Sequence, residues 1–213
     1  MFENNKSKQI SPAVVNRLPR YYRYLSDLIK NDKFKISSKE LSTLMNVTAS
    51  QIRQDLNCFG GFGQQGYGYN IKQLHSEIGK ILGIERNFKA VVIGAGKIGT
   101  TISKSGLFIK RGVTLKGLFD IDPHIIGSEI AGLSVMDIKN AADYCRKNKI
   151  DIVVLTLPKD ETEPVANMLA ETGVKGFWNF SNMELKIGNP NIKVQNIHMG
   201  DSLMLLCFDI NNQ

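Results

Sequence analysis

A glycine-rich turn between an apolar strand and a helix constrains the fold of this chain more than any other feature. Residues 88–93 form an apolar run, and Gly94, Gly96 and Gly99 follow it in the spacing G-x-G-x-x-G. In such a turn the glycines allow a tight bend, a close approach of a phosphate to the backbone, and close packing of helix on strand. A second apolar run ends in Asp120, 21 residues after Gly99. This spacing predicts an acid that hydrogen-bonds the ribose hydroxyls of a dinucleotide.

The second part of the chain is predicted to be an α/β domain with a Rossmann-like parallel sheet. Further strands are expected at residues 150–155, 176–179 and 193–197, with a helix near 163–171. Because Asp120 would repel a 2′-phosphate, NAD(H) is favoured over NADP(H). Candidate cofactor contacts lie in the glycine turn, at the acid, beyond the strand at 150–155, and around the nicotinamide ring. They are Gly94, Ala95, Gly96, Lys97, Ile98, Gly99, Asp120, Thr156, Pro158, Phe180 and Met199.

The formal charge of +7 is unevenly distributed along the chain. Residues 1–83 contain twelve Lys/Arg against six Asp/Glu, whereas residues 84–213 contain fifteen against fourteen. A basic first part joined to a nearly neutral second part suggests a nucleic-acid-binding module attached to a domain with another task. A solvated basic surface without a partner is the alternative.

The basic part has the pattern of a helix-turn-helix. Ser11-Pro12 begins a helix that Pro19 is expected to restart, with Leu18, Tyr22, Leu25 and Ile29 on its buried face. Capping boxes at residues 37–40 and 48–51 begin two short helices. Leu41 and Leu44 should face inward from the first of these, and Ile52, Leu56 and Phe59 from the second. Two short capped helices joined by a tight turn are typical of this motif.

Polar side chains on the second short helix suit contacts with DNA. Arg can bond guanine, and Gln or Asn can bond adenine, in the major groove. A glycine-rich hairpin at residues 60–69 would then form the wing of a winged helix, whose tip could enter a minor groove. An ordinary surface helix and a flexible loop are the alternatives. The candidate DNA-binding residues are Ser50, Gln51, Arg53, Gln54 and Asn57 on the helix, and Gln64, Gln65, Gly66 and Tyr67 on the wing.

A helix at residues 71–82 should link this module to the α/β domain, and a last helix should cover residues 201–208. The last helix is apolar on nearly every side, which predicts burial against a second subunit; packing on its own sheet is the alternative. No apolar run approaches the roughly 20 residues that span a bilayer, and the N-terminus shows no signal peptide. A cytoplasmic protein without a membrane partner is therefore expected. The three cysteines indicate no metal site; Cys58 would be a thiol sensor or a small core residue.

A sensor is favoured over an enzyme, because no length remains for a substrate domain. Of the three histidines, His75, His124 and His198, only His198 could approach a nicotinamide. Two alternatives remain open. One is an NAD-dependent oxidoreductase with a basic N-terminal domain, and the other is a repressor that binds coenzyme A or another nucleotide.

From residue 11 to residue 208 the sequence resembles the Rex family of redox-sensing transcriptional repressors. The stretches that carry the resemblance are residues 17–23, 48–56, 62–69, 94–99, 119–123 and 176–180. The resemblance implies a homodimer with a domain-swapped C-terminal helix. This dimer would bind palindromic operator DNA and release it when NADH binds. The implied domains are 1–83 (winged helix), 84–197 (Rossmann) and 198–213 (swapped helix).

Individual residues also match the family pattern. Arg53 matches its recognition-helix arginine, Gln65 its wing tip, and Gly94, Gly96, Gly99 and Asp120 its cofactor site. In some members a switch couples an arginine of the first helix to a tyrosine and an aspartate. Here Arg23 matches the arginine, but Ser105 replaces the tyrosine and His198 replaces the aspartate. The resemblance therefore implies a switch that is wired differently or responds more weakly.

Overall fold

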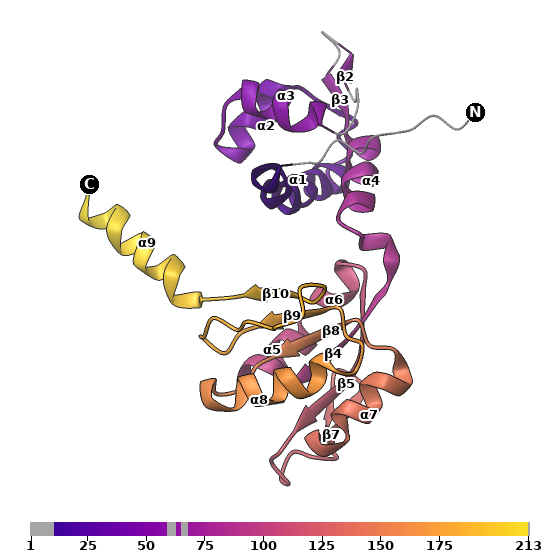
Figure 1. The fold of residues 1–213 in the computed structure, drawn as a ribbon. Helices are drawn as coiled ribbons and strands as arrows, with labels where there is room; N and C mark the ends of the chain where they lie inside the picture. The colour runs from indigo at the N-terminus through magenta and orange to yellow at the C-terminus, as the bar shows by residue number, and fades with distance from the viewer. Residues whose placement is uncertain (1–10, 59–62, 65–67, 213) are drawn as a thin grey trace. The chain divides into compact units, whose positions relative to one another are not determined.

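The computed structural model describes residues 11–58, 63–64 and 68–212. The chain divides into two compact units, one on each side of the bond between Glu85 and Arg86 (Figure 1). The first unit contains four helices and a small sheet among its described residues, and the second contains the large sheet.

The N-terminal unit confirms the helix-turn-helix and the paired strands after it. Its elements are α1 (Pro12–Lys30), β1 (Lys35–Ile36), α2 (Ser38–Met45), α3 (Ala49–Asn57), β2 (Gly63–Gln64), β3 (Gly68–Asn70) and α4 (Ile71–Ile81). Strand β3 pairs antiparallel with both β1 and β2. Phe59, which was expected to face the core, lies outside the described residues, as do Gln65, Gly66 and Tyr67 at the wing tip.

Helix caps explain where α2 and α3 begin. The Ser37 hydroxyl accepts from the backbone of Glu40, and the Glu40 carboxylate accepts from the backbone of Ser37, which confirms the first capping box. The second box forms only in part. The Thr48 hydroxyl accepts from the backbone of Gln51 at 3.1 Å, but the Gln51 amide donates to Asp55 instead of returning to Thr48.

The buried face of two helices is rotated from the predicted one. On α1, Tyr21 is fully buried whereas Tyr22 is only partly buried. On α2, Met45 is fully buried and Leu44 is 41% exposed. Residues four apart lie above one another on a helix, so Leu41 and Met45 share the inward face. Ile81, in the last turn of α4, is exposed.

Two prolines lie inside helices that were predicted to break or begin near them. Helix α1 continues through Pro19, although proline has no backbone N–H to donate to the carbonyl of Val15. Helix α8 (Lys159–Ala170) begins directly after Pro158 and continues through Pro164, so it starts four residues before the predicted position 163. Asp160 and Glu161 in its first turn favour this earlier start, because carboxylates stabilise helix N-termini.

The second unit is a Rossmann fold with a seven-stranded sheet. Its strands are β4 (Phe88–Ile93), β5 (Val113–Asp120), β6 (Glu129–Ile130), β7 (Leu133–Asp137), β8 (Ile152–Leu155), β9 (Gly176–Asn179) and β10 (Lys193–Asn196). They lie in the order β10-β9-β8-β4-β5-β7-β6, parallel except for β6. The strand order reverses between β4 and β8, and open α/β sheets bind their ligands at the carboxyl ends of such strands.

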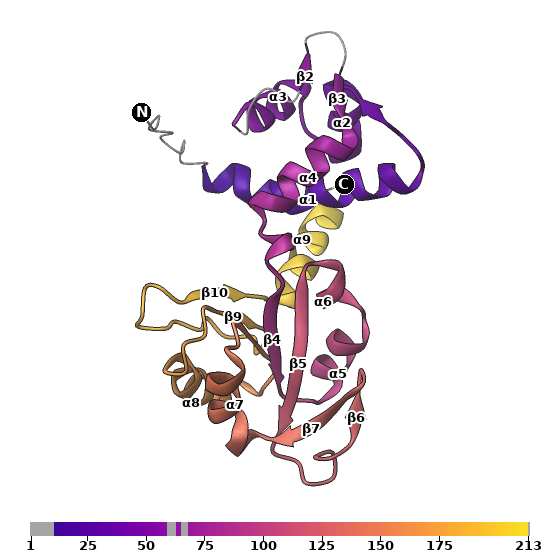
Figure 2. The ribbon, with the colours of Figure 1, turned by 90° about the vertical axis from the view of Figure 1, so that its right-hand side faces the viewer.

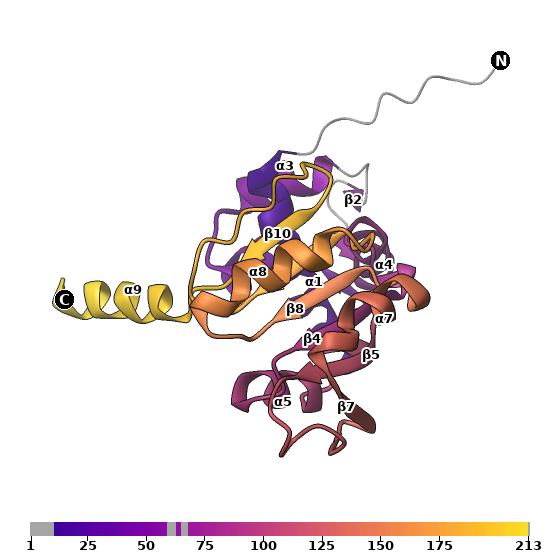
Figure 3. The ribbon, with the colours of Figure 1, turned by 60° about the horizontal axis from the view of Figure 1, so that its bottom comes forward.

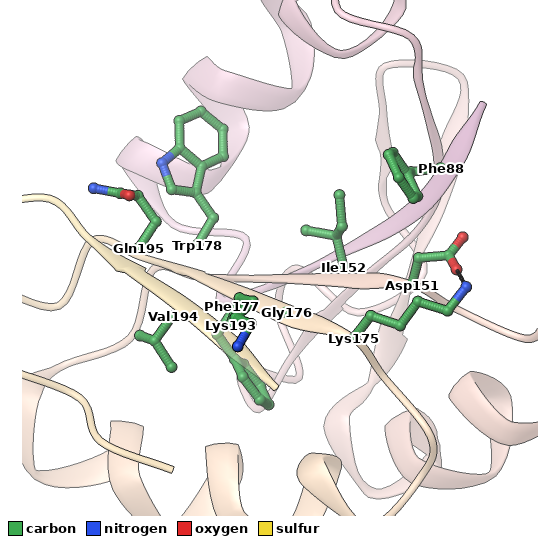
Figure 4. A pocket seen from close by; sticks show the side chains of 10 residues that line it. All are labelled: Phe88, Asp151, Ile152, Lys175, Gly176, Phe177, Trp178, Lys193, Val194 and Gln195. Atoms are coloured by element: carbon green, nitrogen blue, oxygen red, sulfur yellow. Dashed lines mark hydrogen bonds and ion pairs between the residues drawn. The ribbon is translucent and has the colours of Figure 1, made fainter. Parts of the chain in front are cut away.

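The helices of this unit leave part of one face of the sheet uncovered. Helices α5 (Lys97–Lys104) and α6 (Leu107–Lys110) lie on one side, and α7 (Ala141–Asn148) and α8 on the other (Figure 2). No helix connects β9 to β10. An apolar hollow of about 360 Å³ lies over β8, β9 and β10, where Phe88, Ile152 and Trp178 project from the same face (Figure 4). This part of the sheet therefore lacks the helical cover that the other strands have.

The last helix, α9 (Met199–Asn211), is longer than the predicted 201–208 and exposed along its whole length. It extends away from the end of β10 (Figure 3). Its large apolar side chains are 53–65% exposed; they are Met199, Leu203, Met204, Leu205, Leu206, Phe208 and Ile210. Among the described helices, none has the length and apolar character needed to cross a membrane.

A histidine joins α4 to α1. The His75 ring stacks on Tyr22 with centroids 4.0 Å apart, and its Nε2 lies 2.8 Å from the Ser26 hydroxyl. That hydroxyl donates its one proton to the carbonyl of Tyr22 at 2.7 Å. It must therefore accept from His75, so the neutral ring carries its proton on Nε2. Burial lowers the pKa of His75 below its usual value.

We expect the protein to lose stability between pH 7 and pH 5 through His75. Its pKa is lower in the folded chain, so the unfolded chain takes up a proton first and unfolding becomes easier as the pH falls below about 6.5. Thermal unfolding of His75→Gln, measured over this range, should show a flatter pH dependence than wild type. The exposed His124 offers the matched control, since His124→Gln should keep the wild-type profile. Identical profiles for all three proteins would contradict this role of His75.

Candidate cofactor site and nucleic-acid interface

The glycine turn between β4 and α5 accepts only glycine at two of its three positions. Gly94 has a φ of +97°, and a Cβ there would lie 2.8 Å from the carbonyl oxygen of Thr156. A Cβ on Gly99 would collide with the carbonyl oxygen of Gly94. At Gly96, in contrast, no atom lies within 4 Å of the Cβ position. The turn is therefore packed on both sides and open in the middle, where a pyrophosphate would approach the backbone.

The open side of the turn leads to the start of α5. Gly96 is the N-cap residue and supplies no side chain to bond the first backbone N–H groups of the helix. Those donors, on the residues following Gly96, are free to bind an anion, and the helix dipole favours negative charge there. Lys97 is exposed at this end of the helix. The arrangement fits the diphosphate of a dinucleotide.

Thr156 packs against the glycine turn and hydrogen-bonds to its backbone. Its hydroxyl is 2.6 Å from the carbonyl oxygen of Gly94 and 3.0 Å from that of Ile93. The hydroxyl proton is thus used inside the protein, and Thr156 supports the glycine turn. Pro158 is the N-cap residue of α8. The role of Thr156 was not visible in the sequence, because it depends on β4 and β8 being neighbours.

Asp120 ends β5 beside the same turn. Its Oδ2 accepts from the backbone N–H of Ala95 at 2.6 Å, and its Oδ1 accepts from the N–H groups of Ile121 and Asp122 at 2.7 and 3.0 Å. An ionised carboxylate offers about four acceptor positions, so capacity remains for a ribose hydroxyl. The acid is held next to the glycine turn at the position where a dinucleotide places its adenosine ribose.

A cavity of about 350 Å³ lies at the carboxyl ends of β8, β9 and β10. It brings together three predicted cofactor residues, Ile98, Phe180 and Met199. The sequence interpretation did not include the other residues that line it, which are Leu157, Ser181, Asn182, Ile197 and Gly200. The cavity is mainly apolar and adjoins the start of α5, as the nicotinamide end of a bound dinucleotide requires.

His198 does not line this cavity, although Ile197 and Met199 on either side of it do. Its Nε2 lies 3.1 Å from Oε1 of Glu184. The other carboxylate oxygen of Glu184 accepts from Asn196 at 2.8 Å. His198 is thus engaged with the loop before β10, away from the position expected for a proton donor to the nicotinamide.

On the N-terminal unit, α3 presents one polar face to solvent. Ser50, Arg53, Gln54 and Asn57 are exposed, whereas Gln51 is half-buried. The Arg53 guanidinium lies 3.3 Å from the Ser38 hydroxyl, and it points away from the core. Gln64 lies in β2 and pairs with Gly68 through the backbone. Four predicted DNA-binding side chains are therefore on the same exposed helix face.

A buried acid behind this face was missed by the sequence interpretation. Asp55 is fully buried and accepts from Arg17 through two bonds of 2.7 Å, from Tyr21 at 3.0 Å and from Gln51 at 2.8 Å. Burial acts to raise the pKa of Asp55, but these hydrogen bonds outweigh it and hold the pKa below its usual value. The carboxylate is thus ionised, and it joins α3 to α1.

The other predicted residues lie as follows. Arg23 is exposed on α1 with its guanidinium 5.6 Å from the Tyr24 ring centre. Ser105 ends α5, and its hydroxyl donates to the carbonyl of Ile102. Because Arg23 belongs to one unit and Ser105 and His198 to the other, their coupling stays a prediction. Cys58 is exposed, so it is not a core residue.

Known proteins match both units of the chain. Residues 9–57 match a family model described as "Putative DNA-binding protein N-terminus", and residues 85–183 match one described as "CoA binding domain". The redox-sensing transcriptional repressor Rex of Thermoanaerobacter pseudethanolicus is 48% identical over 98% of this chain and 93% of its own length. The Rex repressor of Clostridium perfringens strain 13 is 46% identical over 97% of both chains.

The chain belongs to the Rex family of redox-sensing transcriptional repressors. A crystal structure of RSP, a Rex-family repressor, in complex with NAD⁺ and operator DNA superposes with a TM-score of 0.89 at 47% identity, covering 95% of this chain and 93% of that one. RSP in complex with NADH superposes with a TM-score of 0.88 at 44% identity, covering 96% of both chains. These Rex structures contain NAD⁺ or NADH, although the matching family model is named for coenzyme A.

Proposed function

We propose that this protein binds operator DNA through α3 and its wing, and that NADH lowers its affinity for the operator. The observation that carries this proposal is the presence, in one chain, of an exposed polar face on α3 and a glycine turn that is open only at Gly96. The RSP complexes with NAD⁺ and operator DNA and with NADH support it. A protein bound to bacterial operator DNA would act in the cytoplasm.

A regulatory role is favoured over catalysis. The cavity at the nicotinamide end is lined by apolar and small polar side chains, with none of the protein's histidines among them. Hydride transfer to or from a carbonyl needs a proton donor or acceptor near the reacting atom. The nearest histidine in sequence, His198, is bonded to Glu184 instead. We therefore assign no catalytic residue to this chain.

NADH would act by shifting the protein between two states. A ligand moves such an equilibrium only by its difference in affinity for the two states, and each tenfold difference is worth about 1.4 kcal/mol. NADH and NAD⁺ differ mainly in the charge and shape of the nicotinamide ring. Discrimination would thus lie in the cavity around Ile98, Phe180 and Met199, whose apolar surface disfavours the positive charge of NAD⁺.

A homodimer would cover the exposed surface of α9. A helix that is apolar on every side is normally buried, and large exposed apolar surfaces mark interaction sites. The second unit also carries the apolar hollow at Phe88, Ile152 and Trp178, which no helix of that unit covers (Figure 4). We propose that α9 is exchanged between two copies. Two copies of α3 would then face the two halves of a palindromic operator.

One titration tests the function. A duplex would first be selected from a random library by the full-length protein. Its release would then be followed by fluorescence anisotropy against NADH, NAD⁺ and coenzyme A in separate experiments. We expect release by NADH at a concentration at least tenfold below that of NAD⁺, and none by coenzyme A.

The other outcomes favour the competing functions. Release by coenzyme A alone would favour a repressor of different ligand specificity. Consumption of NADH in the presence of a small carbonyl compound would favour an oxidoreductase. Failure to select any duplex would contradict the proposed DNA binding itself.

A further inference from the structure

Two glutamines on α3 have the same chemistry and different surroundings. Gln54 is exposed, and no described residue hydrogen-bonds its side-chain amide. Gln51 is half-buried, and its Nε2 donates to Oδ1 of Asp55 at 2.8 Å. From sequence alone both residues were candidates for contact with a base, because their types are identical and they lie only three positions apart.

The periodicity of the helix explains the difference. Residues four apart lie on the same face of a helix, so Gln51 lies above Asp55, and Gln54 lies above Ser50. Asp55 is fully buried against α1, whereas Ser50 is exposed. Gln51 therefore lies at the border of the buried face. Gln54 lies on the exposed face with Arg53 and Asn57.

The orientation of the Gln51 amide follows from its partner. Asp55 is ionised and can only accept hydrogen bonds, so the amide must turn its NH₂ group toward the acid. Turning the amide to suit a base would remove a hydrogen bond from a buried charge, which is costly. Gln51 is thus held in one orientation by the protein, before any DNA is bound.

The remaining bonds to Asp55 come from α1. Arg17 contributes two bonds of 2.7 Å in a fork, and Tyr21 contributes one of 3.0 Å. Because these donors approach the carboxylate from a neighbouring helix, they set how far α3 is rotated about its own axis. That rotation decides whether Arg53 and Gln54 face outward together.

We propose that Gln54 contacts a base of the operator, and that Gln51 and Asp55 are positioning residues that hold α3 in the rotation required for this contact. This inference rests on the proposed binding of operator DNA. It predicts that two Gln→Ala substitutions on one helix have different kinds of effect.

The experiment compares Gln54→Ala with Gln51→Ala on a set of duplexes. The set consists of the duplex selected by the wild-type protein and all its single base-pair variants. For Gln54→Ala we expect the preference at one base pair of each half-site to fall by roughly 5- to 150-fold, with the other preferences unchanged. For Gln51→Ala we expect weaker binding to every duplex by a common factor, and a lower midpoint of thermal unfolding. Asp55→Asn should reproduce the pattern of Gln51→Ala more strongly.

Several results would overturn the inference. Loss of preference in Gln51→Ala at a base pair other than the one affected by Gln54→Ala would make Gln51 a direct contact. Unchanged affinity of Gln51→Ala for every duplex would remove its positioning role, and unchanged preferences in Gln54→Ala would remove the base contact. Gln51→Ala deletes no charge, so it tests the inference even if Asp55→Asn fails to fold. A wild-type protein that prefers no duplex would instead contradict operator binding, which is a separate result.

Discussion

Replacing Gly96 by alanine is expected to weaken NADH binding by roughly 10- to 100-fold while the protein stays folded. The added methyl group meets no protein atom within 4 Å, and the φ of −66° at this position suits any residue. It would occupy the space through which a pyrophosphate reaches the backbone, and overpacking of this kind costs about 1–3 kcal/mol. Operator release should then require a correspondingly higher NADH concentration.

Gly99→Ala is the matched comparison within the same turn. There the methyl group would collide with the carbonyl oxygen of Gly94 and lie 2.8 Å from Oγ1 of Thr156. We expect this variant to lose thermal stability, whereas Gly96→Ala should lose less than about 1 kcal/mol as an N-cap change. Isothermal titration with NADH and thermal unfolding of both variants would measure these effects. Wild-type NADH affinity in Gly96→Ala would exclude the turn as the pyrophosphate site.

Replacing Leu206 by aspartate is expected to dissociate the protein into monomers. Leu206 is 53% exposed in the single chain, so the substitution should cost the isolated fold little. In a dimer that buries α9, each copy would lose about 1.5–3 kcal/mol of apolar burial and would place a charge in the interface. Symmetry doubles the loss, so the dissociation constant should rise by at least about a hundredfold.

Operator affinity should fall when the dimer dissociates, because a monomer contacts only one half-site. Ser202→Asp provides the control, since it adds the same charge to a polar position in the first turn of α9. Sedimentation velocity at micromolar concentration would compare the three proteins. A dimer that persists in Leu206→Asp would show that α9 is not the dimer contact.

Much of the fold follows from local sequence signals. The capping box at Ser37 and Glu40 forms as predicted, because its two bonds depend on residues three apart in the chain. The proline at position 19 misleads, since burial of α1 on its core outweighs the loss of one backbone bond. Tertiary packing also explains why Met45 is buried in place of the predicted Leu44. Which apolar side chain of α2 is buried depends on the side that faces the neighbouring helices, and not on hydrophobicity alone.

The sequence by itself determined the glycine turn, the acid at position 120 and the polar face of α3, because each depends on the backbone conformation or spacing of nearby residues. Only the tertiary structure decided which of two similar side chains already forms a hydrogen bond within the protein. It joins Asp55 to Arg17 across 38 residues and thereby separates Gln51 from Gln54. It also places Thr156 beneath the glycine turn, and leaves α9 and the sheet around Trp178 uncovered. These outcomes depend on contacts between distant segments, and such contacts exist only once the chain has packed.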